Sequence, residues 1–332
     1  MTHCVGCPVP FLQKKGGDGT FKRKKILVIA GPTATGKTEL SLRIAKGIGG
    51  EIISCDSMQV YLGADIGSAK PSLEELRAIP HHLIDIRDIR EPFNVADFYQ
   101  EATVSLEEIF LRKNVPIAVG GSGFYVHTFL YGPPKGPPSN RNVRDKLEGD
   151  LEKFGVEFLY GKLLELDPDY AKCITMQDRH KIVRALEIIL LTGKKVTEIP
   201  KPSEEDISRE FDFRCWFIYY PKPILYERIE YRCDQMIKEG LIEEVMSLKE
   251  GLKENSAAAN AIGYRQALLY VNSLQGENDW KEFVKTFKQA SRNYAKRQFT
   301  WFRKEPLFRW VDLSTTTLEH VAEVIIQDFE QN

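Results

Sequence analysis

Short apolar runs alternate with amphipathic segments through the first 120 residues of the chain. The apolar runs have the length and character of buried parallel strands, and they fall at 26–30, 51–55, 82–86 and 116–119. Between them, apolar residues recur at helical spacing over 39–48 and 95–112. Strands that alternate with helices predict an α/β fold, built on a parallel sheet flanked by helices.

The pattern changes at 131–140, where YGPPKGPPSN contains four prolines and two glycines. Such a segment cannot continue a helix or a central strand, so it predicts a linker. Helical periodicity then runs to residue 200, and the next strand-like run comes only at 214–219, before long helices at 223–303. We therefore expect a core that a mostly helical insertion interrupts. The predicted bounds are 1–25 for a flexible basic arm, 26–135 with 213–320 for the core, and 140–205 for the insertion.

A phosphate-binding motif stands between the first predicted strand and the first predicted helix. The segment GPTATGKT at 31–38 is a complete G-x-x-x-x-G-K-T. Its glycines let backbone N–H groups converge on phosphate oxygens at the positive end of the following helix. Lys37 adds a positive charge, and the Thr38 hydroxyl is suited to Mg²⁺. The motif predicts a P-loop NTPase-like core with a phosphate-bearing ligand, without saying which phosphate.

Two acidic residues lie in or after predicted strands and are candidates for metal or proton chemistry, Asp56 and Asp85. Asp56 begins a polar cluster beyond the carboxyl end of its strand, where ligands bind in such sheets. The alternative for Asp56 is a helix N-cap. GGSGFY at 120–125 follows the last of these strands, and its glycines permit close backbone approach to a ligand. Ser122 could bond a phosphate there or cap the next helix.

Charge is distributed unevenly along the chain. The 46 Lys and Arg residues against 47 Asp and Glu give a net charge of −1, which argues against a nucleic-acid partner only as an average. Residues 1–25 carry six basic side chains against Asp18, and 285–309 carries eight against Glu305. Local basic surfaces of this kind are expected where a protein binds RNA phosphates.

No apolar run approaches the roughly 18 residues of a membrane span, and residues 1–25 lack the apolar stretch of a secretory signal. Six cysteines in 332 residues do not make a disulfide scaffold. Cys4 and Cys7 form a C-x-x-C, but no second pair follows at zinc-finger spacing. We expect a cytoplasmic protein with no membrane partner.

Eight segments together resemble the tRNA dimethylallyltransferases. They are GPTATGKT, ISCDSMQVYLGADIGSAKP, PHHLID, ADF, GGSGFY, RALE, AIGYRQ and RNYAKRQFTWFR, which occur in the family's order and cover roughly 26–303. No C₂H₂-type zinc finger follows the core, so the bacterial type is favoured. Family members transfer the dimethylallyl group of dimethylallyl diphosphate to the exocyclic 6-amino group of the adenosine just 3′ of the tRNA anticodon. The resemblance implies that the P-loop holds a prenyl diphosphate.

The resemblance also implies catalytic roles. Asp56 matches the family's general base, which accepts a proton from the adenine amino group. Ser122 replaces the threonine of GGTG and is expected to bond the leaving diphosphate. The family has an arginine that contacts diphosphate; Arg228 and Arg232, four apart on one predicted helix face, both fit, and Arg228 is preferred. The implied catalytic set is Asp56, Ser122, Lys37 and Arg228; the implied diphosphate-binding set is Gly31, Thr33, Ala34, Thr35, Gly36, Lys37, Thr38 and Arg232, with Mg²⁺ on Thr38.

Predicted RNA contacts come from charge periodicity and from the resemblance. Four cations spaced three or four apart form a stripe on one helix side, Lys285, Lys288, Arg292 and Lys296. We assign Phe283, Phe287, Ala290, Tyr294 and Trp301 to a core-facing side, and Gln177, His180, Arg184 and Glu187 to a polar face opposite Ile182, Leu186 and Ile189. The implied tRNA-binding set is Asp56, Ser57, Met58, Gln59, Arg144, His180, Arg184, Gly263, Tyr264, Arg265, Gln266, Lys288, Arg292 and Lys296.

Two other functions fit part of the pattern. A prenyltransferase acting on free AMP, ADP or ATP fits the P-loop, but it needs neither the helical insertion nor the basic segment 285–309. A P-loop kinase or ATPase fits the phosphate motif alone. The expected partners are tRNA, through its anticodon stem-loop, and dimethylallyl diphosphate, and we expect a monomer.

Overall fold

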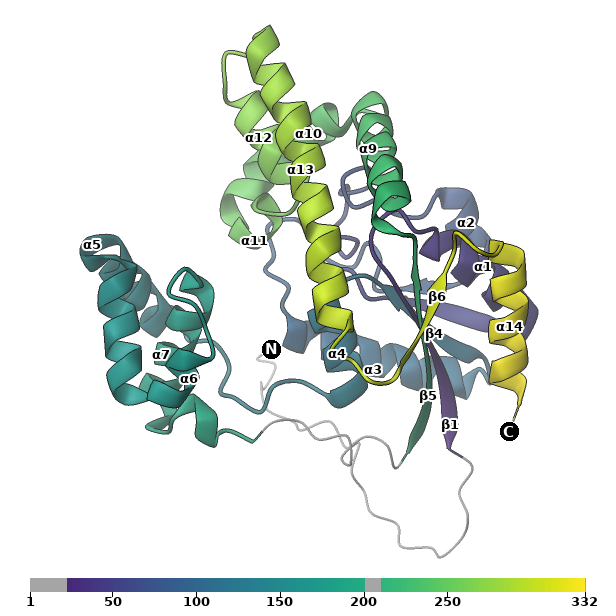
Figure 1. Ribbon diagram of the computed structural model, residues 1–332, viewed down its shortest axis with the longest axis horizontal. Coiled ribbons are helices and arrows are strands. Elements are labelled where there is room, and N and C mark those ends of the chain that lie inside the picture. Colours follow the sequence, from purple (N-terminus) through teal and green to yellow (C-terminus); the bar gives the residue numbers. More distant parts are fainter. Residues whose placement is uncertain (1–22, 201–209, 332) are drawn as a thin grey trace, which may run out of the picture.

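Six parallel strands in the order β3-β2-β4-β1-β5-β6 form the sheet of this protein, shown in Figure 1 as a computed structural model. The structure describes residues 23–200 and 210–331. The predicted basic arm, with Cys4 and Cys7, lies almost wholly outside the described residues, as does the end of the predicted insertion. The strands are β1 (Lys24–Ala30), β2 (Gly50–Ser54), β3 (His81–His82), β4 (Val115–Gly120), β5 (Phe211–Tyr219) and β6 (Phe308–Asp312).

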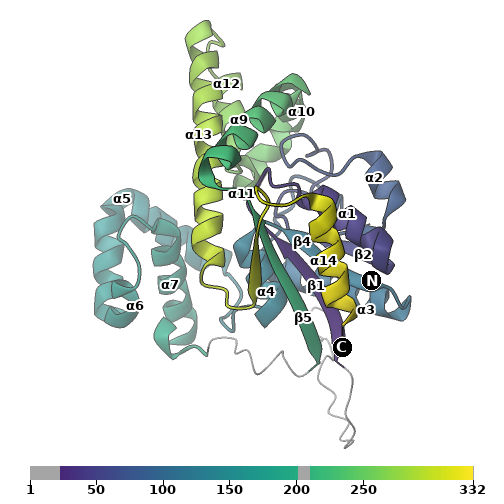
Figure 2. The ribbon, with the colours of Figure 1, turned by 45° about the vertical axis from the view of Figure 1, so that its right-hand side comes forward.

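The central strand β1 explains why the sheet is covered on both faces. Its residues Ile26–Ala30 are fully buried, as expected for a parallel strand between two helical layers. Leu27 and Ile29 pack with α1 (Lys37–Ile48) and α14 (Leu318–Glu330), whereas Ile26, Val28 and Ala30 pack in the core on the other face. That face is covered by α3 (Val95–Leu111), α4 (Gly123–Tyr131) and the end of α13 (Glu277–Phe302) (Figures 1 and 2). The predicted α/β fold is confirmed.

Two strands differ from expectation. The strand expected at 82–86 is reduced to His81–His82, because Leu83 and Asp85 have positive φ angles of 64° and 56° that are incompatible with an extended ladder. The Lys70 ammonium instead donates to the Asp85 carboxylate at 2.6 Å, so the chain turns back toward the segment that follows β2. Strand β6 was not predicted; it lies at the sheet edge and is only partly buried, so its hydrophobic pattern is weak.

A group of helices stands beyond the carboxyl ends of the strands (Figures 1 and 2). They are α9 (Lys222–Lys238), α10 (Leu241–Glu254), α11 (Ser256–Ala259), α12 (Tyr264–Val271) and the first part of α13. The short α2 (Leu73–Ala78) lies near the same edge of the sheet. This arrangement places α9 and α13 beside the loops that follow the strands.

A helical unit between α4 and β5 has a core of its own. It comprises α5 (Arg141–Leu166), α6 (Pro168–Lys172), α7 (Arg179–Thr192) and the 3₁₀ turn Val196–Glu198. Leu147, Leu159, Leu163, Ile182 and Leu186 form its buried cluster, which is separate from the two cores of the sheet. Both views show this unit standing away from the sheet. None of the helices in 23–200 and 210–331 is long and apolar enough to span a bilayer.

Candidate active site

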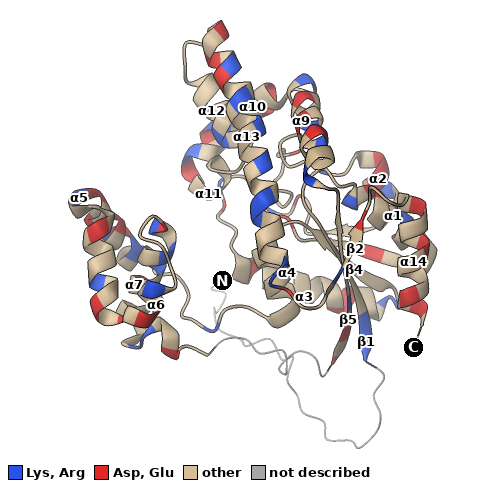
Figure 3. Cartoon of the chain, viewed as in Figure 1, with Lys and Arg blue, Asp and Glu red and all other residues tan. Residues whose placement is uncertain are grey.

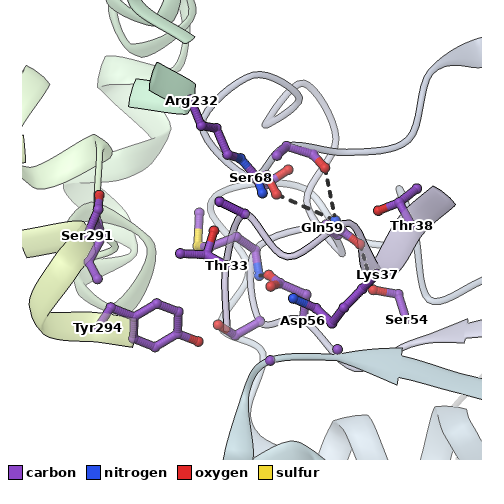
Figure 4. Close-up of a pocket in the computed structure, with 18 of the residues that line it drawn as sticks. Thr33, Lys37, Thr38, Ser54, Asp56, Gln59, Ser68, Arg232, Ser291 and Tyr294 are labelled. Carbon is purple, nitrogen blue, oxygen red and sulfur yellow. Dashed lines mark hydrogen bonds between the residues drawn. The ribbon is translucent and has the colours of Figure 1, made fainter. Parts of the chain in front are cut away.

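A cavity of about 400 Å³ opens at the carboxyl ends of β1, β2 and β4 (Figure 4). Its walls come from the P-loop, the segment that follows β2, the turn after β4, and helices α9 and α13. The predicted site residues that line it are Thr33, Ala34, Thr35, Gly36, Lys37, Thr38, Asp56, Ser57, Met58, Gln59 and Arg232. Residues from Ile52 to Gln298, from several separate segments of the chain, thus meet the phosphate motif in one place.

The P-loop takes the shape that its glycine pattern predicts. Gly36 has φ 89° and ends the loop at the start of α1, and Ala34 also adopts a positive φ of 66°. The Thr35 hydroxyl and the Lys37 ammonium both donate to the Pro32 carbonyl, at 2.8 and 2.7 Å. These bonds close the loop on itself and leave its backbone N–H groups at the positive end of α1.

Gly31 has a packing role rather than a place on the cavity wall. A Cβ atom at Gly31 would lie 2.4 Å from the Ile218 carbonyl oxygen, so only glycine lets the start of the loop pass β5. The described residues that line the cavity begin at Thr33. The structure therefore does not support a direct contact between Gly31 and the diphosphate.

Three poorly solvated charged groups line the cavity together, Lys37, Asp56 and Arg232. Figure 4 shows Lys37 and Asp56 next to each other below the P-loop, with Arg232 reaching in from α9. Burial lowers the pKa of Lys37 to about 7, helped by the charge of Arg232 and opposed by Asp56. Burial also raises the pKa of Asp56, although Met58 N–H donates to its carboxylate at 2.8 Å. Burial lowers the pKa of Arg232. Two poorly solvated cations beside one carboxylate form a site suited to an anion.

The structure separates the two candidate arginines. Arg228 donates from Nε to the Ala34 carbonyl at 2.9 Å and stacks on the Tyr220 ring, so it supports the P-loop from behind. Arg232 is the one that lines the cavity. The position of Arg232 on the cavity wall therefore favours it over Arg228 as the residue at the diphosphate, and both assignments stay predictions.

Sequence reasoning missed Gln298, which joins two loops of the site. Its amide oxygen accepts from Thr33 N–H at 3.1 Å, and its amide nitrogen donates to the Gly121 carbonyl at 2.9 Å. Gln298 lies in the quoted segment RNYAKRQFTWFR, so it was visible, but no spacing rule distinguished it from its neighbours. Ser122 is not among the lining residues; its hydroxyl lies 3.4 Å from that of Tyr294, which does line the cavity.

The AIGYRQ segment lines the cavity through Ala261 and Ile262 and supports its wall from outside through the residues that follow. Tyr264 is fully buried, and its hydroxyl donates to Glu244 at 2.7 Å, so a direct tRNA contact by this side chain is contradicted. Gly263 has φ 91° at the start of α12, where its N–H donates to Gln266 at 2.9 Å. Arg265 is the exposed member of the set and remains a predicted RNA contact.

Predicted RNA contacts in the helical unit fall into two kinds. His180 is exposed at the first turn of α7, and Arg144 is partly exposed on α5, 3.8 Å from Glu148. Arg184 is tied to its own chain, because it pairs with Glu187 at 2.7 Å and donates to the Pro137 carbonyl. Glu187, expected on the polar face, is fully buried and accepts from Ser139 and Asn140. These two residues hold the proline-rich linker against α7.

Most of the predicted basic stripe on α13 is paired with acidic side chains. Lys288 binds Asp234 at 2.8 Å, Arg292 binds Glu230, and both acids come from α9. Lys285 binds Glu282 on its own helix at 3.1 Å. Lys296 is exposed. On the side assigned to the core, Phe283 and Phe287 are buried, but Tyr294 lines the cavity and Trp301 is exposed.

The site also bears on the implied Mg²⁺. No group of three or more His, Cys, Asp or Glu side chains that could hold a metal occurs within 23–200 and 210–331. The Thr38 hydroxyl lines the cavity in the position usual for a P-loop metal ligand. Mg²⁺ commonly keeps several waters and binds through few protein oxygens plus phosphate, so this donor set fits a diphosphate-bound ion.

A family model described as IPP transferase matches residues 59–305 of the chain. The chain belongs to the IPP transferase family. It is 54% identical over 321 residues to a tRNA dimethylallyltransferase of Protochlamydia amoebophila, covering 96% of this chain and 93% of that one. It is 46% identical to the tRNA dimethylallyltransferase of Chlamydia caviae, covering 99% and 96%.

Solved structures of IPP transferases have the same fold. The tRNA isopentenylpyrophosphate transferase of Bacillus halodurans superposes with a TM-score of 0.66 at 37% identity, covering 93% of this chain and 97% of that one. A eukaryotic dimethylallyltransferase acting on tRNA superposes with a TM-score of 0.73 at 27% identity, covering 92% and 80%. The family assignment confirms the resemblance drawn from the sequence segments, and with it a transferase with a P-loop-like α/β fold.

Proposed function

We propose that this chain transfers the dimethylallyl group of dimethylallyl diphosphate to the exocyclic 6-amino group of the adenosine 3′-adjacent to the tRNA anticodon. The observation that carries the proposal is the meeting of Asp56, Lys37 and Arg232, all poorly solvated, at one cavity beside a P-loop. The full-length relatives named tRNA dimethylallyltransferase support it. We also propose that the enzyme works in the cytoplasm as a monomer.

Residues at the cavity account for each bond, charge and proton that changes in the reaction. The adenine amino nitrogen forms a bond to the first carbon of the prenyl chain, and the bond from that carbon to the diphosphate oxygen breaks. The electron pair leaves on the diphosphate, where the P-loop N–H groups, Lys37 and Arg232 stabilise the added charge. Asp56 accepts the proton that the amino nitrogen releases, and its raised pKa brings it closer to the operating pH of such a base.

Mg²⁺, when bound through Thr38, supplies further neutralisation of diphosphate charge. The remaining work belongs to the chain itself. Lys37 and Arg232 lie on different elements, α1 and α9, so they can approach a diphosphate from two sides. The Ser122 hydroxyl lies next to the Tyr294 hydroxyl, so Ser122 acts on the diphosphate site through Tyr294. The target base must leave its stack to enter the cavity, which suits a nucleotide in a loop.

Mass analysis of tRNA nucleosides tests the proposal. Purified protein, dimethylallyl diphosphate and Mg²⁺ are incubated with unmodified tRNA, and the adenosine carrying a dimethylallyl group is expected. Asp56→Asn serves as the matched variant and should bind tRNA while losing transfer by orders of magnitude. If the protein hydrolyses ATP without a prenyl donor and the tRNA stays unmodified after the incubation, the result would instead support a kinase or ATPase.

A second arm of the same experiment replaces tRNA with AMP. Efficient transfer to AMP would favour the free-nucleotide prenyltransferase. We expect tRNA to be the far better acceptor, since the helical unit and α13 offer surface that a mononucleotide does not use.

A further inference from the structure

Exposed cations gather at one end of α13. Up to residue 292 the helix carries Lys281, Lys285, Lys288 and Arg292, which all have carboxylate partners. The second half and the residues just after it carry four exposed cations, Lys296, Arg297, Arg303 and Lys304. Within the described part of the chain none of these four forms an ion pair. Figure 3 shows Lys and Arg bands along α13 down to its end above α4. The unpaired positive charge is therefore concentrated in the last turns of the helix.

Two aromatic rings lie exposed among these cations. Trp301 on α13 is 39% exposed and Phe124 on α4 is 43% exposed. Their ring centroids are 6.1 Å apart in an edge-on arrangement. The indole ring packs against the backbone of Gly123, where a Cβ atom would lie 2.5 Å from it. His127 meets the same ring edge-on at 6.3 Å and is fixed by Glu305 at 2.8 Å. The indole is thus held in place from below while one side stays open to solvent.

This aromatic pair borders the cavity. Gly121 lines the cavity and lies only two residues before Gly123. Arg297 and Gln298 line it too, and Trp301 follows them by one turn of α13. The guanidinium of Arg297 lies over the ring of Tyr294, another lining residue, at 5.5 Å. A polymer that enters the cavity over the end of α13 would therefore pass close to Trp301 and Phe124.

We propose that Trp301 and Phe124 form a stacking platform for an unpaired RNA base next to the one that enters the cavity, with the neighbouring cations holding its phosphates. The platform is defined as Phe124 and Trp301; the cations are Lys296, Arg297, Arg303 and Lys304. This inference rests on the proposed function and names where its RNA substrate is held.

The chemistry favours RNA over other occupants. When one base leaves its stack, the face of its neighbour is uncovered, and an aromatic side chain can cover it. Aromatic rings interleaved with exposed cations combine stacking with phosphate neutralisation, the combination found in single-strand binding surfaces. A prenyl chain would gain from the rings but not from the four cations around them.

The primary test measures affinity for an anticodon stem-loop RNA, without any transfer reaction. Trp301→Leu and Phe124→Leu are compared with Trp280→Leu, which lies on the same helix and is 37% exposed, about 30 Å away by the helix rise. Loss of one stacked base should weaken RNA binding roughly 5- to 150-fold for the platform variants. Trp280→Leu should match the unaltered protein. Equal affinity in all three variants overturns the proposal.

Charge variants supply an independent readout. Lys296→Gln or Arg303→Gln should lower the slope of log affinity against log salt by about one. Lys281→Gln, whose charge is already paired with Glu277, should leave the slope unchanged. An identical salt slope in all of these variants contradicts the assignment of the phosphate contacts.

Two controls separate alternative outcomes. Because Trp301 packs on Gly123, Trp301→Phe keeps an aromatic ring at this position and tests whether a ring alone restores RNA affinity. If RNA affinity is the same with and without a ring at both positions, the platform is rejected. If the leucine variants instead weaken prenyl diphosphate binding and leave RNA affinity intact, the rings belong to the prenyl site and the proposal is wrong. If RNA affinity falls as expected but unmodified tRNA is never prenylated by the parent protein, the proposed function fails while the platform stands.

Discussion

The Tyr264 hydroxyl donates a hydrogen bond of 2.7 Å to the Glu244 carboxylate. The same carboxylate accepts hydrogen bonds from the backbone N–H groups of residues 65–67, at 2.6–3.0 Å. That segment leads directly into Ser68 and Ala69, which line the cavity and whose carbonyls accept from Gln59. Helices α10 and α12 therefore fix one wall of the active site through a single partly buried carboxylate.

Substituting Glu244 should loosen that wall. Glu244→Gln places an NH₂ group against N–H donors, which leaves partly buried donors unpaired at a cost of about 1 kcal/mol, the lower end of the range for a buried donor. We expect a lower melting temperature and a reduced kcat/KM, with Tyr264→Phe changing both in the same direction by less. Glu243→Gln, at the exposed residue just before Glu244, is the control. Thermal unfolding and tRNA transfer assays check this, and unchanged activity in folded Glu244→Gln would show that the wall tolerates movement.

Substituting the buried Gln298 should weaken diphosphate binding at the donor site. Gln298→Ala removes both the bond to Thr33 and the bond to Gly121, so the P-loop and the turn after β4 lose their link. We expect weaker inorganic diphosphate binding, by about tenfold if one net hydrogen-bond equivalent is lost. Thr300→Ala, exposed two residues later on the same helix, provides the comparison. Calorimetric titration with diphosphate measures the change, and equal affinities would argue against the linking role.

The two arginines of α9 should behave differently. Arg232→Gln removes a cation from the cavity wall and should weaken diphosphate binding while the melting temperature stays the same or rises, since a buried charge is lost. Arg228→Gln breaks the bond to the Ala34 carbonyl and should lower the melting temperature together with binding. The contrast between the two variants is the prediction. A reversed pattern would restore Arg228 as the diphosphate contact.

Diphosphate binding should depend on pH through Lys37. Burial lowers the pKa of Lys37 to about 7 in the free protein, whereas the unfolded chain keeps this proton to about pH 10.5. An anion favours the charged form, so binding at pH 8 should take up a proton, and affinity should fall as pH rises above 7.

Calorimetry in two buffers of different ionisation enthalpy at pH 8 detects that proton. Lys37→Met should show no such uptake, which separates this lysine from the nearby Asp56 and Arg232. The free energy of unfolding of the ligand-free protein has the opposite pH dependence to diphosphate affinity. Between pH 7 and about 10 the unfolded chain binds more protons, so the Lys37 contribution to the free energy of unfolding rises with pH.

Local patterns predicted the elements that carry their own signal. The strand, glycine turn and helix around the P-loop follow from apolar length and glycine spacing, and the structure has them at β1 and α1. Sequence spacing could not separate Arg228 from Arg232, because residues four apart share a helix face. Only the packing of α9 against the P-loop decides which guanidinium reaches the cavity.

Long-range polar contacts explain the other differences. Lys288 looked like a free cation because its partner Asp234 comes 54 residues earlier, on another helix. Tyr264 and Glu187 looked like surface residues because polar side chains are usually exposed. Both are buried, since Glu244 satisfies one, and Arg184 with the linker satisfies the other. A single chain read in order does not reveal such pairings.

The place of β5 in the sheet sets the order in which this enzyme can be completed during synthesis. Strand β1 is paired on one side by β4 and on the other by β5, which begins only at residue 211. Gly31 at the root of the P-loop rests on the Ile218 carbonyl. A nascent chain that has left the ribosome only as far as α7 therefore has one open edge on β1 and an unsupported phosphate loop, an exposed state in which aggregation or premature proteolysis competes with folding.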